Sequence, residues 1–437
     1  MTTYLNAKKP ILYWFLILLF SYAAIFNYEY LFLIGVFFFG ISISKESFTD
    51  LQISLLIKFP YVFYSIRLIA GINENLNTLW KSMSHHNYSL GARFFDLQQV
   101  LVSVKCNFSD TQEFYYNYSP FKHSCPWSAN YGPLLEVIPY FGSIWRDTII
   151  LSVIFLFCLG VLYRYLLNQF PKNQIFIMLL FISPSMNFLI ERMNIDVMIL
   201  LLSFYAIKNI LDYPLLSSFT LFLLALLKLH PLGFIFGIIL YSYIYEKKNL
   251  LKINISLTGL FLIIYSLFSY IKQTALTTTW RPSEPLLTFG ILSDAKFLNE
   301  SLNLTLWFVY LLLIFFLLIL QNKIFNTSFL ISNKIPEKSI VFIYSYGIFL
   351  LLNILYANYD YRIPIIFPLV IYIIPFFSDK IKILVIATFL LMPFGIANSL
   401  EIFELAMVIT GKILFYYFFS VVIRFIFYDV KSKNITN

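Results

Sequence analysis

Polar residues interrupt an apolar sequence, "LIERMNIDVMILLL", at residues 189–202. Glu191, Arg192, Asn194 and Asp196 lie there between two hydrophobic runs. Charged groups retained at membrane depth usually mark a partner, a water-filled cavity or a substrate pathway. Arg192 and Asp196 are four residues apart, so they can share one helical face and pair with each other. The stretch therefore predicts either an ion pair at a helix end or part of a binding site.

Two later segments carry residues of the same kind. In "KLHP", Lys228 and His230 precede a proline, and reaching toward lipid headgroups is the alternative role for this lysine. In "NYDYRIP", Asp360 and Arg362 are two residues apart, so they do not share a helix face. Arginine suits two-point recognition of phosphate, which makes an anionic substrate a candidate for both segments.

A lone carboxylate, Asp96, lies in "FFDLQQVLVSV". The apolar residues Phe94, Leu97, Leu101 and Val104 recur there at helical spacing, which predicts an amphipathic helix along the membrane surface. Asp96 is near the start of this helix. It either stabilises the helix terminus electrostatically or acts as a general base at the membrane–water boundary.

Tyr131 precedes a Gly-Pro turn signal in "ANYGPLLEVIPYFG", where it either packs or reaches a polar substrate. His85 and His86 are adjacent and therefore do not share a helix face. With only four histidines in the chain and no Cys/His spacing near them, no metal site is expected.

The elements that must position these residues are apolar helices. The chain of 437 residues is 60% hydrophobic and 12% charged, whereas soluble domains average roughly half apolar and a quarter charged. The apolar runs do not alternate as barrel strands do. We expect an all-α, polytopic transmembrane bundle of about 12–14 helices, with residues 1–437 as a single integral membrane domain. The candidate spans are roughly 11–27, 30–43, 51–70, 147–167, 174–190, 195–208, 214–228, 231–245, 250–271, 303–320, 339–357, 363–378, 381–397 and 413–428.

Charge orients these spans. The net charge of +9 reports topology in a membrane protein, and no nucleic-acid partner is expected. With a cytoplasmic amino terminus, most short cytoplasmic connections carry a cation, and the long loop 71–146 lies on the outer face together with the polar turns described above. Cations and carboxylates then converge at one membrane boundary, as a substrate with a phosphate and a hydroxyl requires.

Two of the three cysteines, Cys106 and Cys125, lie in the outer loop. An oxidising compartment would allow a disulfide between them, and two free thiols are the alternative. The third cysteine, Cys158, lies within a predicted span.

The order of "FFDLQQ", "NYGPL", "ERMNID", "LLKLHPLG" and "YDYRIP" resembles the membrane-embedded GT-C glycosyltransferases. The similarity covers about residues 80–370 and is closest to the bacterial polyprenyl-phosphomannose-dependent alpha-mannosyltransferases. Two positions depart from the family pattern. Met193 stands where a small residue, commonly glycine, follows the arginine of R-x-N-x-D, and Asp96 lacks the adjacent second acid of many related enzymes.

The resemblance implies transfer of a sugar from a polyprenyl-phosphate donor to a lipid or glycan acceptor, with inversion and with Asp96 as the base. It implies a bacterial inner membrane location, a periplasmic active site in the loop 71–146, membrane lipids as partners, and no cofactor. Cations beside the leaving phosphate would lower the barrier electrostatically. The expected substrate-binding residues are Arg192, Asn194, Asp196, Lys228, His230, Asp360, Arg362 and Tyr131.

Two alternatives remain open. A glycan polymerase or ligase would also have basic residues in its outer loops, but it would use diphosphate-linked donors. A transporter or flippase would place ionisable groups near the bilayer midplane, often on broken helices in repeated halves. No repeat is visible, but Lys58 and Arg67 inside an early apolar run suit a transporter better than a transferase.

Overall fold

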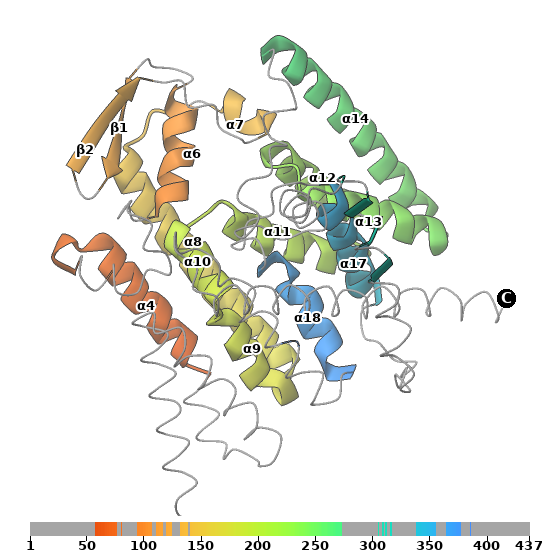
Figure 1. Ribbon diagram of the computed structural model, residues 1–437. Helices are drawn as coiled ribbons and strands as arrows, with labels where there is room; N and C mark the ends of the chain where they lie inside the picture. Colours follow the sequence, from red (N-terminus) through yellow and green to blue (C-terminus); the bar gives the residue numbers. More distant parts are fainter. Residues whose placement is uncertain are drawn as a thin grey trace, which may run out of the picture.

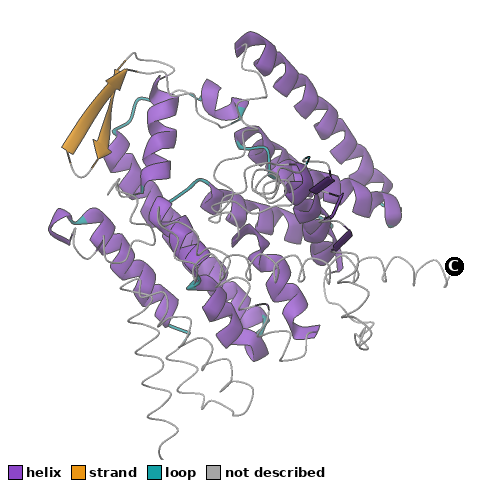
Figure 2. Ribbon diagram, viewed as in Figure 1, coloured by secondary structure: helices purple, strands orange, loops and turns teal. Residues whose placement is uncertain are grey.

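The computed structural model describes residues 57–76, 80, 94–106, 111–116, 119–124, 132–138, 140–272, 338–354 and 364–376, with a few positions between 305 and 316 and at 385. The prediction of a helical protein is confirmed for these residues (Figures 1 and 2). They also include one two-stranded hairpin. The helices are α4 (Phe59–Ile72), α6 (Phe95–Cys106), α7 (Pro133–Val137), α8 (Ile144–Gln169), α9 (Gln174–Phe181), α10 (Pro184–Arg192), α11 (Asp196–Lys208), α12 (Pro214–Leu227), α13 (Pro231–Ile244), α14 (Lys248–Lys272), α17 (Lys338–Ile354) and α18 (Phe367–Ile373). Short 3-10 turns follow α4, α8 and α18.

Proline sets where several helices restart. Pro133, Pro184, Pro214 and Pro231 lie in the first turns of α7, α10, α12 and α13. Proline has no N–H to leave unpaired there, and its fixed φ already suits a helix. The breaks before these prolines hold several of the polar residues that the sequence singles out.

Helices α13 and α17 pack closely against each other. A Cβ on Gly237 of α13 would lie 2.6 Å from the Ile343 carbonyl oxygen of α17. A Cβ on Gly347 of α17 would lie 2.4 Å from the Phe234 ring of α13. Glycine has no side chain, so the two helices can approach closely at these positions.

Two helices, Ile144–Gln169 and Lys248–Phe268, are long and apolar enough to cross a membrane, with mean hydropathies of 2.3 and 1.8. Their outer faces expose large apolar side chains such as Phe157 of α8 and Ile263 of α14. In Figure 1, α14 lies along one edge of the molecule. These exposed apolar side chains on both helices fit contact with lipid.

The other predicted spans have mixed outcomes. Shorter helices occupy the predicted stretches at 51–70, 195–208, 214–228, 231–245, 339–357 and 363–378. The stretch predicted at 174–190 is not one helix: it breaks before Pro184 into α9 and α10, and the bend is 56°. The stretches 11–27, 30–43 and 413–428 lie outside the described residues, as do most of 303–320 and all of 381–397 except residue 385.

The helix predicted at the membrane surface differs from the expectation. Helix α6 does form, and its apolar residues Leu97, Leu101 and Val104 are buried. Its polar residues Asp96 and Gln98 are buried as well, because α8, α10 and β1 pack around it. An amphipathic helix at a surface would keep its polar face in water, so α6 is instead an internal helix of the segment 71–146.

The same loop contains an antiparallel hairpin that the sequence analysis did not predict. Strands β1 (Thr111–Tyr116) and β2 (Ser119–Ser124) pair with Thr111 opposite Ser124, and β1 contacts α6. Cys106, the last residue of α6, is disulfide-bonded, and Cys158 is a free thiol. Cys125, the predicted disulfide partner of Cys106, lies outside the described residues.

Candidate functional site

Asp96 lies in the first turn of α6. The chain enters this helix through Phe94, which adopts a left-handed φ of 53° and is fully buried. The Asp96 carboxylate lies 2.5 Å from Nη2 of Arg192 and accepts a hydrogen bond of 2.7 Å from Nδ2 of Asn194. The two partners are far from Asp96 in sequence, so the tertiary fold creates the contact.

Arg192 and Asp196 do not share a helix face, contrary to the prediction from their spacing. Met193 caps α10 with φ 45° and ψ 48°, and this left-handed residue ends the helix. Asp196 then starts α11 as a separate helix. The i,i+4 relation holds only within a continuous helix, so Arg192 turns to Asp96 while Asp196 turns elsewhere.

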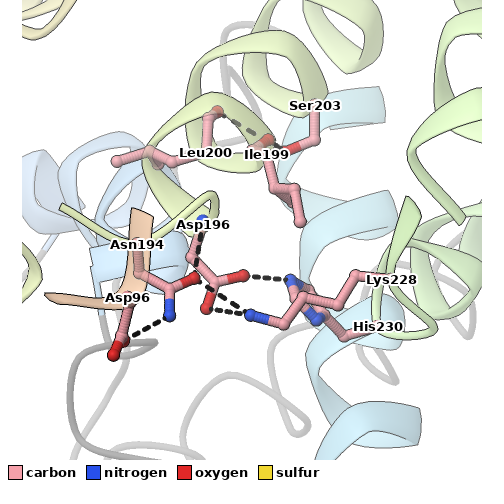
Figure 3. Close-up of polar contacts among 8 residues, drawn as sticks. All are labelled: Asp96, Asn194, Asp196, Ile199, Leu200, Ser203, Lys228 and His230. Carbon is pink, nitrogen blue, oxygen red and sulfur yellow. Dashed lines mark hydrogen bonds and ion pairs between the residues drawn. The ribbon is translucent and has the colours of Figure 1, made fainter. Parts of the chain in front are cut away.

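The Asn194 amide links the Asp96 carboxylate to Lys228 and to the backbone of Asp196 (Figure 3). It donates to Asp96 through Nδ2, and its Oδ1 accepts from the Asp196 backbone N–H at 3.0 Å and from Lys228 Nζ at 3.1 Å. A neutral residue with both donor and acceptor groups is suited to this place. Asn194 therefore separates two acids and connects each to its neighbours.

Lys228 and His230 come from the break between α12 and α13. Lys228 Nζ lies 2.8 Å from Oδ2 of Asp196, and His230 Nε2 lies 3.2 Å from Oδ1 of the same carboxylate. Lys228 has extended backbone, which carries its side chain away from the end of α12 toward α11. Figure 3 shows both side chains converging on Asp196.

The end of the segment 71–146 is held at the same break. The Gly132 N–H donates to the Leu227 carbonyl at 2.7 Å. A Cβ at this position would lie 2.1 Å from the Leu226 carbonyl oxygen, so only glycine fits. The hydrogen bond places Gly132, the residue after Tyr131, against Leu227, which directly precedes Lys228. Tyr131 itself lies outside the described residues, as do Asp360 and Arg362.

Charge and exposure indicate how the cluster can work. Two carboxylates, Asp96 and Asp196, face one arginine, one lysine and one histidine. The Arg192 side chain is 24% exposed, whereas Asp96, Lys228, Asp196 and His230 side chains range from 0% to 7%. A carboxylate offers about four lone-pair positions, so Asp96 can accept a further hydrogen bond from a hydroxyl entering beside Arg192.

A second polar network lies directly behind this cluster and was not predicted as part of a site. Arg67 of α4 is fully buried and contacts Asn187 and Glu191 of α10. In the sequence, Arg67 is recognisable only as a charge inside an apolar helix. This pattern does not identify the residues that it contacts.

Six of the predicted residues thus meet at one place: Asp96, Arg192, Asn194, Asp196, Lys228 and His230. They come from α6, from the break between α10 and α11, and from the break between α12 and α13. The case for a function rests on these residues themselves. No family model matches the chain, and comparisons with curated proteins and with solved structures also find no match.

Proposed function

We propose that the protein is a membrane glycosyltransferase that moves a sugar from a polyprenyl-phosphate donor to a lipid or glycan acceptor. One observation carries this proposal. A buried carboxylate, Asp96, lies 2.5 Å from the partly exposed Arg192, in a cluster that also holds Lys228 and His230. A base that removes a hydroxyl proton and cations that receive a departing phosphate are the two requirements of this reaction.

In the proposed reaction, Asp96 removes the proton from an acceptor hydroxyl. The acceptor oxygen then attacks the sugar C1 from the face opposite the donor phosphate. The bond between C1 and the phosphate oxygen breaks, and polyprenyl phosphate leaves with the electron pair, so the anomeric centre is inverted. Arg192 lies at the open edge of the cluster, where it would contact the phosphate first. Lys228 and His230 lie behind it, where both contact Asp196.

Helix length supports a lipid-linked substrate. Helices α11, α12 and α13 have 13, 14 and 14 residues. At 1.5 Å per residue each rises about 20 Å, which is less than the roughly 30 Å hydrocarbon core. A cluster at the ends of such helices is suited to a recess beside the lipid tails, where a polyprenyl chain can lie with its phosphate against Arg192.

The backbone at Met193 supports the resemblance to GT-C enzymes. Glycine is common after the arginine in that family's R-x-N-x-D pattern, and Met193 adopts the left-handed conformation that glycine favours. The departure in residue type therefore leaves the expected turn in place. By the same resemblance, we propose a bacterial inner membrane location with the site open to the periplasm.

Reconstitution in vesicles tests the proposal. Purified protein is supplied with a polyprenyl-monophosphate sugar or a polyprenyl-diphosphate oligosaccharide, and the product is identified by mass spectrometry. We expect the monophosphate donor to be consumed, and Asp96→Asn to abolish transfer. Asp212→Asn, which neutralises an exposed carboxylate between α11 and α12, is the matched control. Consumption of the diphosphate donor alone would identify a polymerase or ligase instead.

A transporter is the second candidate, because α9 and α10 form a broken helix with a bend of 56°. Broken helices carry the substrate sites of many transporters. Movement of a lipid-linked sugar or small solute across the vesicle membrane, with no glycoside formed, would favour this class and exclude the transferase.

A further inference from the structure

Arg67 lies in α4 with its side chain fully buried, 125 positions before Arg192 along the chain. A buried guanidinium is strongly unfavourable unless its charge and its hydrogen-bond donors are matched. Here Nε and Nη2 both donate to Oδ1 of Asn187, at 2.9 and 2.5 Å, and Nη2 lies 3.7 Å from Glu191. The fold therefore holds Arg67 in one defined orientation.

Both polar partners of Arg67 belong to α10. Asn187 and Glu191 are four residues apart and so lie on one face of this helix. The next residue, Arg192, is the last of α10 and is the partner of Asp96. Because α10 has only nine residues, a grip on this face fixes the rotation of the helix and the direction of Arg192.

Arg67 also reaches the other member of the pair. Its guanidinium carbon lies 5.2 Å from the centre of the Trp80 ring, and Trp80 packs edge-on against Phe94 at 5.3 Å. Phe94 is the left-handed residue that immediately precedes α6, two positions before Asp96. Gly71 of α4 leaves space for this contact, since a Cβ there would lie 2.4 Å from the Phe94 ring.

We propose that Arg67 is a positioning residue for the Asp96–Arg192 pair, acting on α10 through Asn187 and Glu191 and on α6 through Trp80 and Phe94. It does not touch the substrate. The inference rests on the proposed transferase function for its catalytic consequence, but its geometric consequence is independent of that function.

Kinetics of Arg67→Lys give the first test. Lysine keeps the charge beside Glu191 but loses the two-nitrogen grip on Asn187. We expect kcat for sugar transfer to fall about 10- to 100-fold, because small displacements of catalytic groups have effects of this size, and the donor KM to rise because Arg192 no longer meets the phosphate. Asn187→Ala should show the same two changes, and it replaces Arg67→Lys if that variant does not fold. Lys58→Gln, an exposed cation beside the start of α4, is the control and should match wild type.

A double-mutant cycle separates positioning from general destabilisation. If Arg67 acts through Arg192, then Arg67→Lys should lower kcat by less than about twofold when Arg192 is already lysine. Multiplicative effects of the two changes would overturn the proposal. So would wild-type kcat in both folded Arg67→Lys and Asn187→Ala.

Cryo-electron microscopy of Arg67→Lys in nanodiscs gives the structural test. We expect the contact between Asp96 and Arg192, 2.5 Å in the wild type, to open beyond hydrogen-bond distance in the folded variant. An unchanged contact would refute the inference. If wild-type protein transfers no sugar, the proposed function fails, and this measurement still decides the role of Arg67.

Discussion

Asn194 donates its side-chain N–H to Asp96 at 2.7 Å, while the amide oxygen accepts from Lys228 at 3.1 Å. The two bonds require one group with a donor on one side and an acceptor on the other. Asparagine supplies both without adding charge between two acids. This contact is the link between the half of the cluster at Asp96 and the half at Asp196.

Asn194→Asp would break that link. The change places a second carboxylate against Asp96, and like charges at this distance repel unless one group binds a proton. We expect sugar transfer to be lost and the free energy of unfolding to fall by about 1–3 kcal/mol. Turnover and thermal unfolding in detergent measure the two effects. Asn209→Asp, whose amide bonds to an exposed backbone carbonyl, should change neither, and equal effects at both positions would disprove the link.

The buried pair of Lys228 and Asp196 should show strong coupling. Lys228→Met leaves an uncompensated carboxylate in the interior, which lowers the free energy of unfolding by about 3–5 kcal/mol. Adding Asp196→Leu removes that carboxylate, so the double variant should recover most of the loss while staying inactive. Chemical unfolding of the two single variants and the double variant gives the coupling energy. Lys252→Met, on the exposed surface of α14, is the control for loss of a lysine.

Additive changes at Lys228 and Asp196 would contradict this account. Recovery of stability without activity separates the role of the pair in folding from its role in the proposed reaction.

The sequence predicts the members of the cluster better than their partners. Asp96, Lys228 and His230 are conspicuous because charged groups are rare in this chain, and the predicted topology puts them on one face. The spacing of Arg192 and Asp196 also allowed an ion pair between them, because periodicity does not reveal that Met193 ends the helix. Which cation meets which carboxylate depends on tertiary contacts between distant segments.

The sequence analysis did not predict the network around Arg67. Arg67 is visible as an unusual charge, but its contacts with Asn187 and Glu191 join residues more than a hundred positions apart. The hairpin β1–β2 was missed for another reason: the aromatic-rich "EFYYNYSPF" resembles strand sequence, yet in a chain this rich in Phe and Tyr such a run is a weak signal.

Substitution at Met193 should separate turn geometry from packing. The residue is fully buried at a φ of 45°. Met193→Gly relieves left-handed strain of about 1–2 kcal/mol but loses about 2–5 kcal/mol of side-chain burial, so stability should fall modestly. Because glycine keeps the turn, kcat should remain near wild type. Met193→Val keeps apolar bulk, but a β-branched residue does not tolerate this φ, so both stability and kcat should fall. The opposite ranking of the two kcat values would show that side-chain packing, and not the turn, sets the site.

Gly132 offers the sharpest steric test of how the outer loop meets the site. A Cβ there would lie 2.1 Å from the Leu226 carbonyl oxygen, and backbone cannot yield as a flexible side chain would. Gly132→Ala should therefore separate the loop end from α12, break the hydrogen bond to Leu227 and displace Lys228. We expect at least a tenfold loss of transfer, corresponding to about 1.4 kcal/mol in the barrier, and a lower unfolding temperature.

Gly259→Ala is the matched control, because no atom lies within 4 Å of the added Cβ on α14. Alanine in an open helical position should raise stability by about 0.5–1 kcal/mol and leave transfer unchanged. If Gly132→Ala behaves like Gly259→Ala in both measurements, the loop end is not held against α12, and the site must be assembled without it.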